Sequence, residues 1–209
     1  IHRTYTLVNK GGKEIKLSEV KLKEYLDNNN VSISTNGVIY RNNKKGLIPS
    51  LLSTWFDKRN EYRKLMKKFA DEDDMDKYHY FNRMQYIQKV VLNSLYGVLG
   101  LPVFRFYDLD NDEAVTTTGQ ELIKYTKVIG NHFYNNELGD DKDYCIYIDT
   151  DSVFFSALPI IEKRFPNQKL SDVMMTQRIS EIASEVQSFI NRMYGQFSKR
   201  FCNLDHHRF

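Results

Sequence analysis

The sequence predicts an α+β fold, in which an antiparallel sheet with packed helices is joined to an antiparallel hairpin of two long helices. Two observations carry this prediction. Apolar side chains recur at helical spacing over residues 49–69 and 78–100, with an acidic cluster between the two stretches. Short apolar runs flank tight polar turns within residues 31–40 and 144–155, which is typical of strand–turn–strand hairpins.

The composition is that of a globular protein, with 41% apolar and 27% charged residues in 209. A net charge of only +3 gives no strong overall field, so any basic surface must be local. Cys145 and Cys202 do not suggest a disulfide framework, which favours a reducing compartment. No signal peptide or membrane-spanning run is recognisable, so we expect a cytoplasmic protein without a membrane partner. We interpret the chain as a piece of a longer polypeptide, because it begins with Ile and ends abruptly.

The first 40 residues carry the weakest signals. Ser18 is a candidate cap for a short helix that runs through Leu26. Asn36-Gly37 lies between alternating apolar residues, which is a strong hairpin signal.

A helix is expected to begin near Pro49, where a missing N–H costs little. Its apolar stripe consists of Leu51, Trp55, Tyr62, Met66 and Phe69. Arg59, Arg63 and Lys67 recur every four residues along one flank, where like charges repel each other unless an anion lies across them. We interpret Arg59 and Arg63 as a triphosphate clamp; the alternative is a solvated basic flank.

The next helix, residues 78–100, presents two different sides. We expect its apolar stripe to face a core or the preceding helix; the stripe consists of Tyr80, Met84, Ile87, Val91, Leu95 and Val98. On the opposite side lie Lys89, Asn93 and Tyr96, with Asn82 and Gln85 near them. A cation, an amide and a phenol in a row suit an anionic ligand with a flat aromatic part. The alternative is an ordinary surface helix.

Several acidic or metal-like stretches are interpreted as structural. The cluster at Asp71–Asp76 is expected to be an exposed hairpin tip. The stretch Asp108–Asp112 fails the pattern of a calcium loop and is expected to be a turn before a helix at about residues 113–135. His206 and His207 are adjacent, so their side chains are expected to point apart. A last helix is expected over residues 171–201, with inward side chains at Val173, Ile182, Val186, Phe189, Ile190, Met193 and Phe197.

The strongest chemical signal is Asp149-Thr150-Asp151-Ser152 between two apolar runs. Two carboxylates that point the same way at a strand end repel each other unless a cation lies between them, and hard divalent ions prefer such oxygens. An isolated pair of aspartates is weak evidence, since Asp is common in turns. The apolar strands on both sides make this pair a candidate metal site.

Two motifs and the segment between them resemble family B DNA polymerases, in particular the tailed-phage replicative branch. KVVLNSLYG (Lys89–Gly97) is similar to the fingers motif of that family, and YIDTDS (Tyr147–Ser152) is similar to its palm metal motif. FRFYD (Phe104–Asp108) is similar to the segment that leads back into the palm. The resemblance covers about residues 31–155 and departs at Ile148, where the family often has a small residue.

The resemblance implies a DNA-templated DNA polymerase, a nucleotidyltransferase of DNA replication that uses two Mg²⁺ ions, with Mn²⁺ as a substitute. Asp151 would bridge these ions, and Asp149 would be a weaker ligand nearer the primer end. Together they are the expected catalytic and metal-binding residues.

The resemblance also implies roles in nucleotide binding. Lys89 and Arg59 would offset charge on the β- and γ-phosphates, and Arg63 and Asn93 would complete the clamp. Tyr96 resembles the family tyrosine under the nascent base pair.

Three segments follow from this resemblance. Residues 1–48 would be the N-terminal part of the palm, residues 49–100 the fingers hairpin, and residues 101–209 the rest of the palm with a C-terminal helix. Implied partners are primer–template DNA, dNTP, the remaining polymerase segments (exonuclease, rest of the palm, thumb) and a sliding clamp.

The family's first palm carboxylate motif, its exonuclease motifs and its thumb are not found in this sequence, so we expect the isolated fragment to be inactive. The principal alternative is a non-catalytic nucleic-acid-binding module derived from a polymerase, which would keep the fold and lose the acids. A different palm enzyme, such as a reverse transcriptase or a protein-primed polymerase, fits the motifs less well. A purely structural helical protein explains neither the acidic hairpin nor the basic flank.

Overall fold

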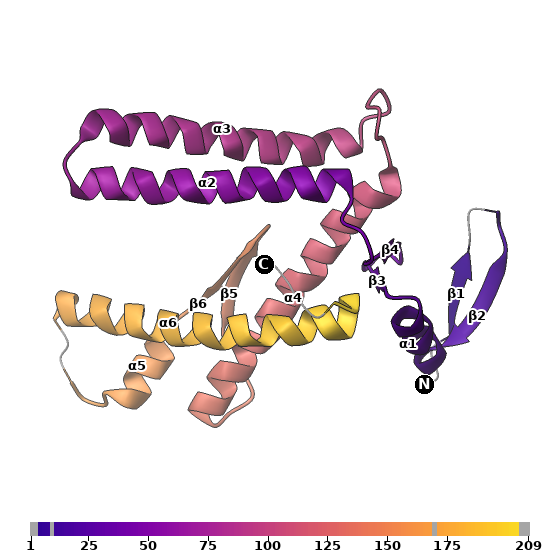
Figure 1. Ribbon diagram of the computed structural model, residues 1–209. Helices are drawn as coiled ribbons and strands as arrows, with labels where there is room; N and C mark the ends of the chain where they lie inside the picture. The colour runs from indigo at the N-terminus through magenta and orange to yellow at the C-terminus, as the bar shows by residue number, and fades with distance from the viewer. Residues whose placement is uncertain (1–3, 9–10, 169–170, 205–209) are drawn as a thin grey trace. The chain divides into compact units, whose positions relative to one another are not determined.

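This computed structural model describes residues 4–8, 11–168 and 171–204, and the chain divides into two compact units (Figure 1). The first unit consists of Ile1–Tyr40 together with Ala114–Phe209, and the second consists of Arg41–Glu113. The second unit is therefore an insertion in the sequence of the first. Within the described ranges, each helix is too short or too polar to span a lipid bilayer.

The strands form antiparallel pairs, and the class of fold is α+β as predicted. In the described residues there are three two-stranded sheets rather than one continuous sheet. They pair β1 (Thr4–Val8) with β2 (Glu14–Ser18), β3 (Val31–Ile33) with β4 (Ile39–Arg41), and β5 (Cys145–Asp149) with β6 (Ser152–Phe155). The pair β1–β2 lies in the N-terminal stretch, where sequence patterns are weakest.

Two small clusters hold the first unit together. Near the N-terminus, Leu22 and Leu26 of α1 (Glu19–Asn28) pack with Val31 of β3. Ser18 caps α1 as predicted, since its Oγ accepts a hydrogen bond from the backbone N–H of Lys21 at 3.5 Å. The hairpin predicted around Asn36-Gly37 is also confirmed, and Gly37 has a φ of +91°.

The larger cluster lies among α4 (Leu109–Leu138), α5 (Leu158–Arg164) and α6 (Asp172–Phe197). Its buried members are Ile129, Tyr134, Ile160, Ile161, Ile182, Val186 and Ile190. Phe155 of β6 packs against the same cluster, so this core supports the acidic hairpin. Arg164 of α5 joins the neighbouring helices, because its Nε donates to Glu137 of α4 and its terminal nitrogens donate to Glu185 of α6.

Two expectations for these helices are wrong. Asp108–Asp112 is not a separate turn, because α4 already begins at Leu109 and the Asp108 carboxylate accepts a hydrogen bond from the backbone N–H of Asn111 at 3.1 Å. Acidic residues in a first helical turn satisfy free N–H groups and complement the helix dipole, which explains their position. Val173 is 79% exposed rather than inward, since it lies in the first turn of α6.

The last helix otherwise follows the prediction. Ile182, Val186, Ile190 and Phe197 are buried, and Phe189 and Met193 are half-buried. The α-helix ends at Phe197 and a short π-helical turn, Ser198–Cys202, follows it. His206 and His207 lie outside the described residues.

The second unit is built on two long helices, α2 (Leu47–Asp71) and α3 (Met75–Leu99), which run antiparallel side by side (Figure 1). The acidic residues between them form the exposed tip, as predicted. Asp74 caps α3 by accepting hydrogen bonds from the backbone N–H and the Nζ of Lys77. Among the described residues, no group of three or more potential metal ligands is found there or elsewhere.

The two helices meet along a seam whose residues alternate at spacings of three and four, the repeat typical of coiled coils. Every seam residue is half-buried or buried: Ile48, Leu52, Trp55, Arg59, Tyr62, Met66 and Phe69 on α2, and Tyr78, Phe81, Gln85, Gln88, Leu92, Leu95 and Leu99 on α3. The ring of Phe81 lies 6.1 Å from that of Tyr62 and 5.5 Å from that of Phe69, which fixes the register.

The apolar stripe predicted for α2 is largely confirmed, with Leu51 the more exposed exception at 38%. The stripe predicted for α3 is wrong by one residue, and only Leu95 of that stripe is in the seam. Tyr80 and Ile87 are 51% and 50% exposed, and Met84, Val91 and Val98 are half-buried beside the seam. The polar seam residues Gln85 and Gln88 explain this error, because they interrupt the apolar repeat by which the seam would be recognised.

Candidate active site

The acidic hairpin has the predicted form. Asp149 at the end of β5 pairs with Ser152 at the start of β6, so Thr150 and Asp151 form a two-residue turn between the strands. Thr150 has a φ of +42°, a conformation that a β-branched residue rarely adopts. Such strain is found most often where the surrounding structure holds functional groups in place.

Each carboxylate at this turn accepts a hydrogen bond from the hydroxyl group that follows it in the sequence. Thr150 Oγ1 donates to Asp149 Oδ1 at 3.0 Å, and Ser152 Oγ donates to Asp151 Oδ1 at 3.2 Å. Both aspartates are exposed. Two exposed carboxylates are hard oxygen donors of the kind that Mg²⁺ prefers, and Mg²⁺ is commonly held by one or two carboxylates together with substrate phosphates. The donor set therefore fits such an ion.

The segment entering β5 is fixed to α4 by hydrogen bonds. Asp143 accepts from Lys127 Nζ at 2.6 Å and from Asn131 Nδ2 at 2.9 Å, and Asn131 Oδ1 in turn accepts from the backbone N–H of Tyr144. These donors, with the backbone N–H of Cys145, lower the pKa of Asp143 to about 2. The hydroxyl of Tyr144 donates to Asp140 at 2.7 Å, and this bond raises the pKa of Tyr144 to about 12.

The strand leaving the turn is fixed to α4 by aromatic packing. The ring of Phe155 stacks on that of Tyr134 at 5.4 Å, and Tyr134 stacks on Tyr144 at 5.3 Å. Gly130 permits this approach, since a Cβ at residue 130 would collide with the Phe155 ring. Both strands of the hairpin are thus held on one helix, with the acidic turn at their free end.

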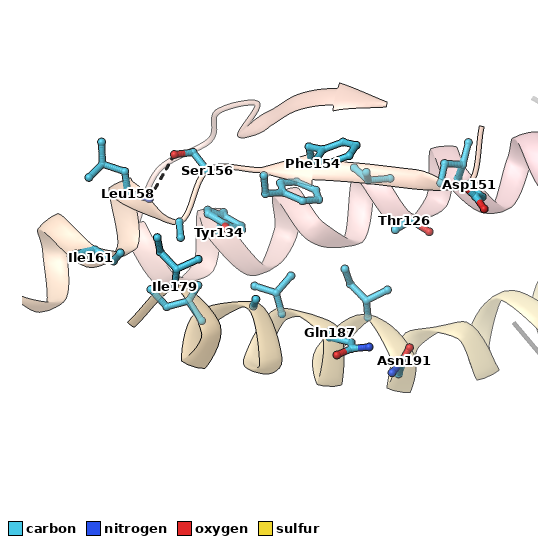
Figure 2. Close-up of a pocket in the computed structure, with 18 of the residues that line it drawn as sticks. Thr126, Tyr134, Asp151, Phe154, Ser156, Leu158, Ile161, Ile179, Gln187 and Asn191 are labelled. Carbon is cyan, nitrogen blue, oxygen red and sulfur yellow. Dashed lines mark hydrogen bonds between the residues drawn. The ribbon is translucent and has the colours of Figure 1, made fainter. Parts of the chain in front are cut away.

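A half-open cavity of about 940 Å³ lies beside β6, between α4 and α6. Asp151 is at one end of it, whereas Leu158 and Ile161 are near the other, as Figure 2 shows. Most of the lining is apolar; Thr126, Gln187 and Asn191 contribute polar side chains. No sequence pattern predicts this cavity, because its walls come from segments far apart in the chain.

In the second unit, the expected nucleotide-binding residues lie on or next to the helical seam. Lys89, Asn93 and Tyr96 each follow a seam residue of α3 directly, and all three are exposed. Arg63 likewise follows the seam residue Tyr62 on α2 and is exposed. Arg59 differs from the prediction of a flanking residue, because it is itself in the seam and half-buried.

These positions place the side chains on one side of the hairpin. One step along either helix turns the side chain by roughly 100° in the same sense. In two antiparallel helices that face each other, the residue directly after a seam residue therefore points to the same side of the pair on both helices. Arg63 and Lys67 of α2 therefore share a side with Lys89, Asn93 and Tyr96 of α3, and we call these five residues the basic face. The more apolar residues Tyr80 and Ile87, which precede seam residues, lie on the other side.

Comparison with known proteins relates this chain to DNA polymerases. A model of DNA polymerase family B matches residues 4–196. The DNA-directed DNA polymerase of Escherichia phage RB69 is 42% identical over 77 residues, covering 36% of this chain and 8% of that protein. The DNA-directed DNA polymerase of Enterobacteria phage T4 is 28% identical over 183 residues, covering 63% of this chain and 20% of that protein.

A eukaryotic protein is also similar. The DNA polymerase delta catalytic subunit of Candida albicans is 33% identical over 116 residues, covering 55% of this chain and 11% of that protein. The chain thus spans at most a fifth of the length of these relatives. Because the family model covers most of the chain, including the acidic hairpin and both helices of the second unit, the chain belongs to DNA polymerase family B.

Proposed function

We propose that this chain supplies the metal-binding turn and the nucleotide-binding hairpin of a DNA-templated DNA polymerase that works in replication. The observation that carries the proposal is the two-residue turn at which Asp149 and Asp151 are both exposed and both accept a hydroxyl hydrogen bond. Membership of family B and the basic face of the second unit support it. We also propose that the chain is part of a larger polymerase, that this polymerase acts on primer–template DNA and dNTP, and that a sliding clamp is its partner.

The proposed segments are the fingers, residues 49–100, and the palm, residues 1–48 and 101–209. The compact unit Arg41–Glu113 supports this assignment, because it encloses the helical hairpin and little else. The remaining palm, the exonuclease and the thumb would come from other parts of the polymerase.

In the proposed reaction, the primer 3′-oxygen attacks the α-phosphorus of the dNTP in line with the leaving group. A bond forms between that oxygen and phosphorus, the bond from the α-phosphorus to the bridging oxygen breaks, and pyrophosphate leaves. The primer hydroxyl loses its proton to water in the same step. Two Mg²⁺ ions, when bound, would offset the phosphate charge and lower the pKa of the attacking hydroxyl.

The residues of this chain have separate roles in that reaction. Asp151 would hold both ions, and Asp149 would bind more weakly near the primer end. The hydroxyl hydrogen bonds to Oδ1 of each aspartate limit the rotation of its carboxylate.

On the basic face, Lys89 would contact the β- and γ-phosphates together with Arg59 of the seam, and Arg63 and Asn93 would complete the clamp. Charge-assisted contacts of this kind contribute about 1.5–3 kcal/mol each. Tyr96, at the end of the same face, would lie under the nascent base pair.

The deciding experiment is primer extension by the full-length polymerase that contains this chain. Asp151→Asn keeps the size of the side chain and removes its charge, so we expect synthesis to be abolished while primer–template affinity stays within about twofold. Asp27→Asn is the matched control, because Asp27 is exposed and forms a surface ion pair with Lys23 on α1. Synthesis that survives Asp151→Asn would contradict the catalytic proposal and favour a non-catalytic nucleic-acid-binding module.

A further inference from the structure

The seam between α2 and α3 contains one polar pair at a single level. Phe81 contacts the rings of Tyr62 and Phe69, so it lies opposite the midpoint between them, near Met66. Because the helices are antiparallel, seven residues back along α2 and seven residues forward along α3 are the same shift in space, about 10.5 Å at 1.5 Å per residue. This shift leads from Met66 to Arg59 on α2 and from Phe81 to Gln88 on α3. Arg59 and Gln88 therefore face each other across the seam.

Both side chains have a buried polar atom without a partner. Arg59 Nε and Gln88 Oε1 are inaccessible to solvent, and neither makes a hydrogen bond within the described part of the chain. A buried donor and a buried acceptor each lose their bonds to water, which is unfavourable unless a partner replaces them. Gln85, the neighbouring seam glutamine, differs in this respect, because its Nε2 donates to Asn82 at 3.0 Å.

The two unpartnered atoms are chemically complementary. The Nε–H of arginine is a donor only, and the Oε1 of glutamine is an acceptor only. A guanidinium that donates its Nε–H to a neighbour keeps both terminal nitrogens free to form a planar fork, the geometry that binds phosphate oxygens in pairs. The glutamine would thereby fix the direction of the fork without touching the phosphate.

We propose that Gln88 is a positioning residue for nucleotide selection, whose Oε1 accepts a hydrogen bond from Arg59 Nε and aims the arginine at the dNTP triphosphate. This inference rests on the proposed role of Arg59 in the triphosphate clamp. In this proposal, the dNTP phosphates attract the terminal nitrogens of Arg59, and the guanidinium rotates so that its Nε–H donates to Gln88 Oε1. A polar pair in an otherwise largely apolar seam also fixes the register of the two helices, as single polar residues do in coiled coils.

The test is single-nucleotide incorporation by the full-length polymerase, with the dNTP dissociation constant and the maximal rate of incorporation measured separately by rapid quench. Gln88→Leu removes the acceptor at nearly constant volume, and we expect it to raise the dissociation constant roughly tenfold. The maximal rate should stay within about twofold. Gln88→Glu keeps an acceptor oxygen and should restore the dissociation constant to within about twofold of the wild type.

A double-mutant cycle separates positioning from simple loss of packing. In an Arg59→Ala background, Gln88→Leu should have no further effect on the dissociation constant. Gln85→Leu is the matched control, and its effect, whatever its size, should be the same in both backgrounds. If Gln88→Leu weakens dNTP binding equally with and without Arg59, the positioning role is wrong.

The outcomes also distinguish this inference from the clamp itself. If Arg59→Ala leaves the dissociation constant unchanged, the clamp role of Arg59 fails and the inference fails with it. If Arg59→Ala weakens binding and Gln88→Leu does not, only the inference fails. Circular dichroism melting of each variant establishes that it is folded, and Gln88→Met replaces Gln88→Leu in the cycle if the leucine variant is not.

Discussion

Gly130 of α4 and Phe155 of β6 are so close that a Cβ on residue 130 would lie 2.2 Å from Cζ of the phenyl ring. This contact sets the distance between the helix and the strand that leaves the acidic turn. We expect Gly130→Ala to force the ring aside and to destabilise the chain by about 1–3 kcal/mol, as overpacking in a core does. Urea unfolding of the 209-residue chain, followed by circular dichroism, measures the change.

Gly119 provides the control on the same helix, because a Cβ there would have no neighbour within 4 Å. Gly119→Ala should stabilise the chain by about 0.5–1 kcal/mol through the better helix propensity of alanine. Equal effects of the two substitutions would show that the contact between Gly130 and Phe155 does not control the packing.

The hydroxyl of Thr150 is expected to matter more than the shape of its side chain. Thr150→Val keeps the branched side chain and removes the donor to Asp149, so the rate of nucleotide incorporation by the full-length polymerase should fall roughly tenfold. Thr150→Ser keeps the donor and should stay within about twofold. A valine variant as fast as the serine variant would exclude a role for this hydrogen bond.

Lys89 is expected to act on nucleotide binding. Lys89→Ala in the full-length polymerase should raise the KM for dNTP at least tenfold, because it removes a charge-assisted contact to phosphate. Lys64→Ala removes the same charge from an exposed position on α2, away from the basic face, and should leave the KM nearly unchanged. Steady-state kinetics over a range of dNTP concentrations checks both, and an unchanged KM in the Lys89 variant would remove this residue from the clamp.

The attachment of β5 to α4 should depend on pH. Hydrogen bonds from Lys127 and Asn131 lower the pKa of Asp143 from 3.8 to about 2, so the folded state favours the ionised carboxylate. A group whose pKa is lowered by folding stabilises the folded state fully at pH values above its pKa in the unfolded chain. This stabilisation is lost as the pH falls through the pKa of the group in the folded chain. We therefore expect Asp143→Asn to lower the Tm at pH 7, and the difference from wild type to shrink between about pH 4 and pH 2.

Melting curves at pH 7, 4, 3 and 2 test this expectation. Lys127→Gln removes the first of the donors and should also reduce the loss of stability in acid. A difference in Tm that stays constant down to pH 2 would show that Asp143 does not supply this pH dependence.

Local patterns were sufficient to predict some of these features. The strands on either side of Asp149-Thr150-Asp151-Ser152 were predictable, because apolar runs and a short polar turn are close in sequence. The beginning of α4 was not predictable, because aspartates such as Asp108 occur both in turns and at helix caps. Here the hydrogen bond from the backbone N–H of Asn111 identifies Asp108 as a helix cap.

Other features depend on residues that only the fold brings together. The seam of α3 was misplaced by one residue because Gln88 is polar and its counterpart Arg59 is charged, and neither is expected in an apolar stripe. No sequence pattern connects Gly130 with Phe155, although their contact holds the acidic hairpin in place. Partnerless buried atoms such as Arg59 Nε can be recognised only once the opposite helix is known.

The hydrogen bond from Asn203 Nδ2 to the backbone carbonyl of Val31, at 2.9 Å, joins residues 172 positions apart. During synthesis on a ribosome, the chain emerges in order, and contacts between distant segments must wait for the later one. The helical hairpin consists of two helices that are neighbours in the sequence, α2 and α3, whereas β3 lacks this hydrogen bond until Asn203 has been synthesised. A nascent chain that stalls before Asn203 would therefore contain both helices of the hairpin but lack the hydrogen bond that ties β3 to the C-terminal segment.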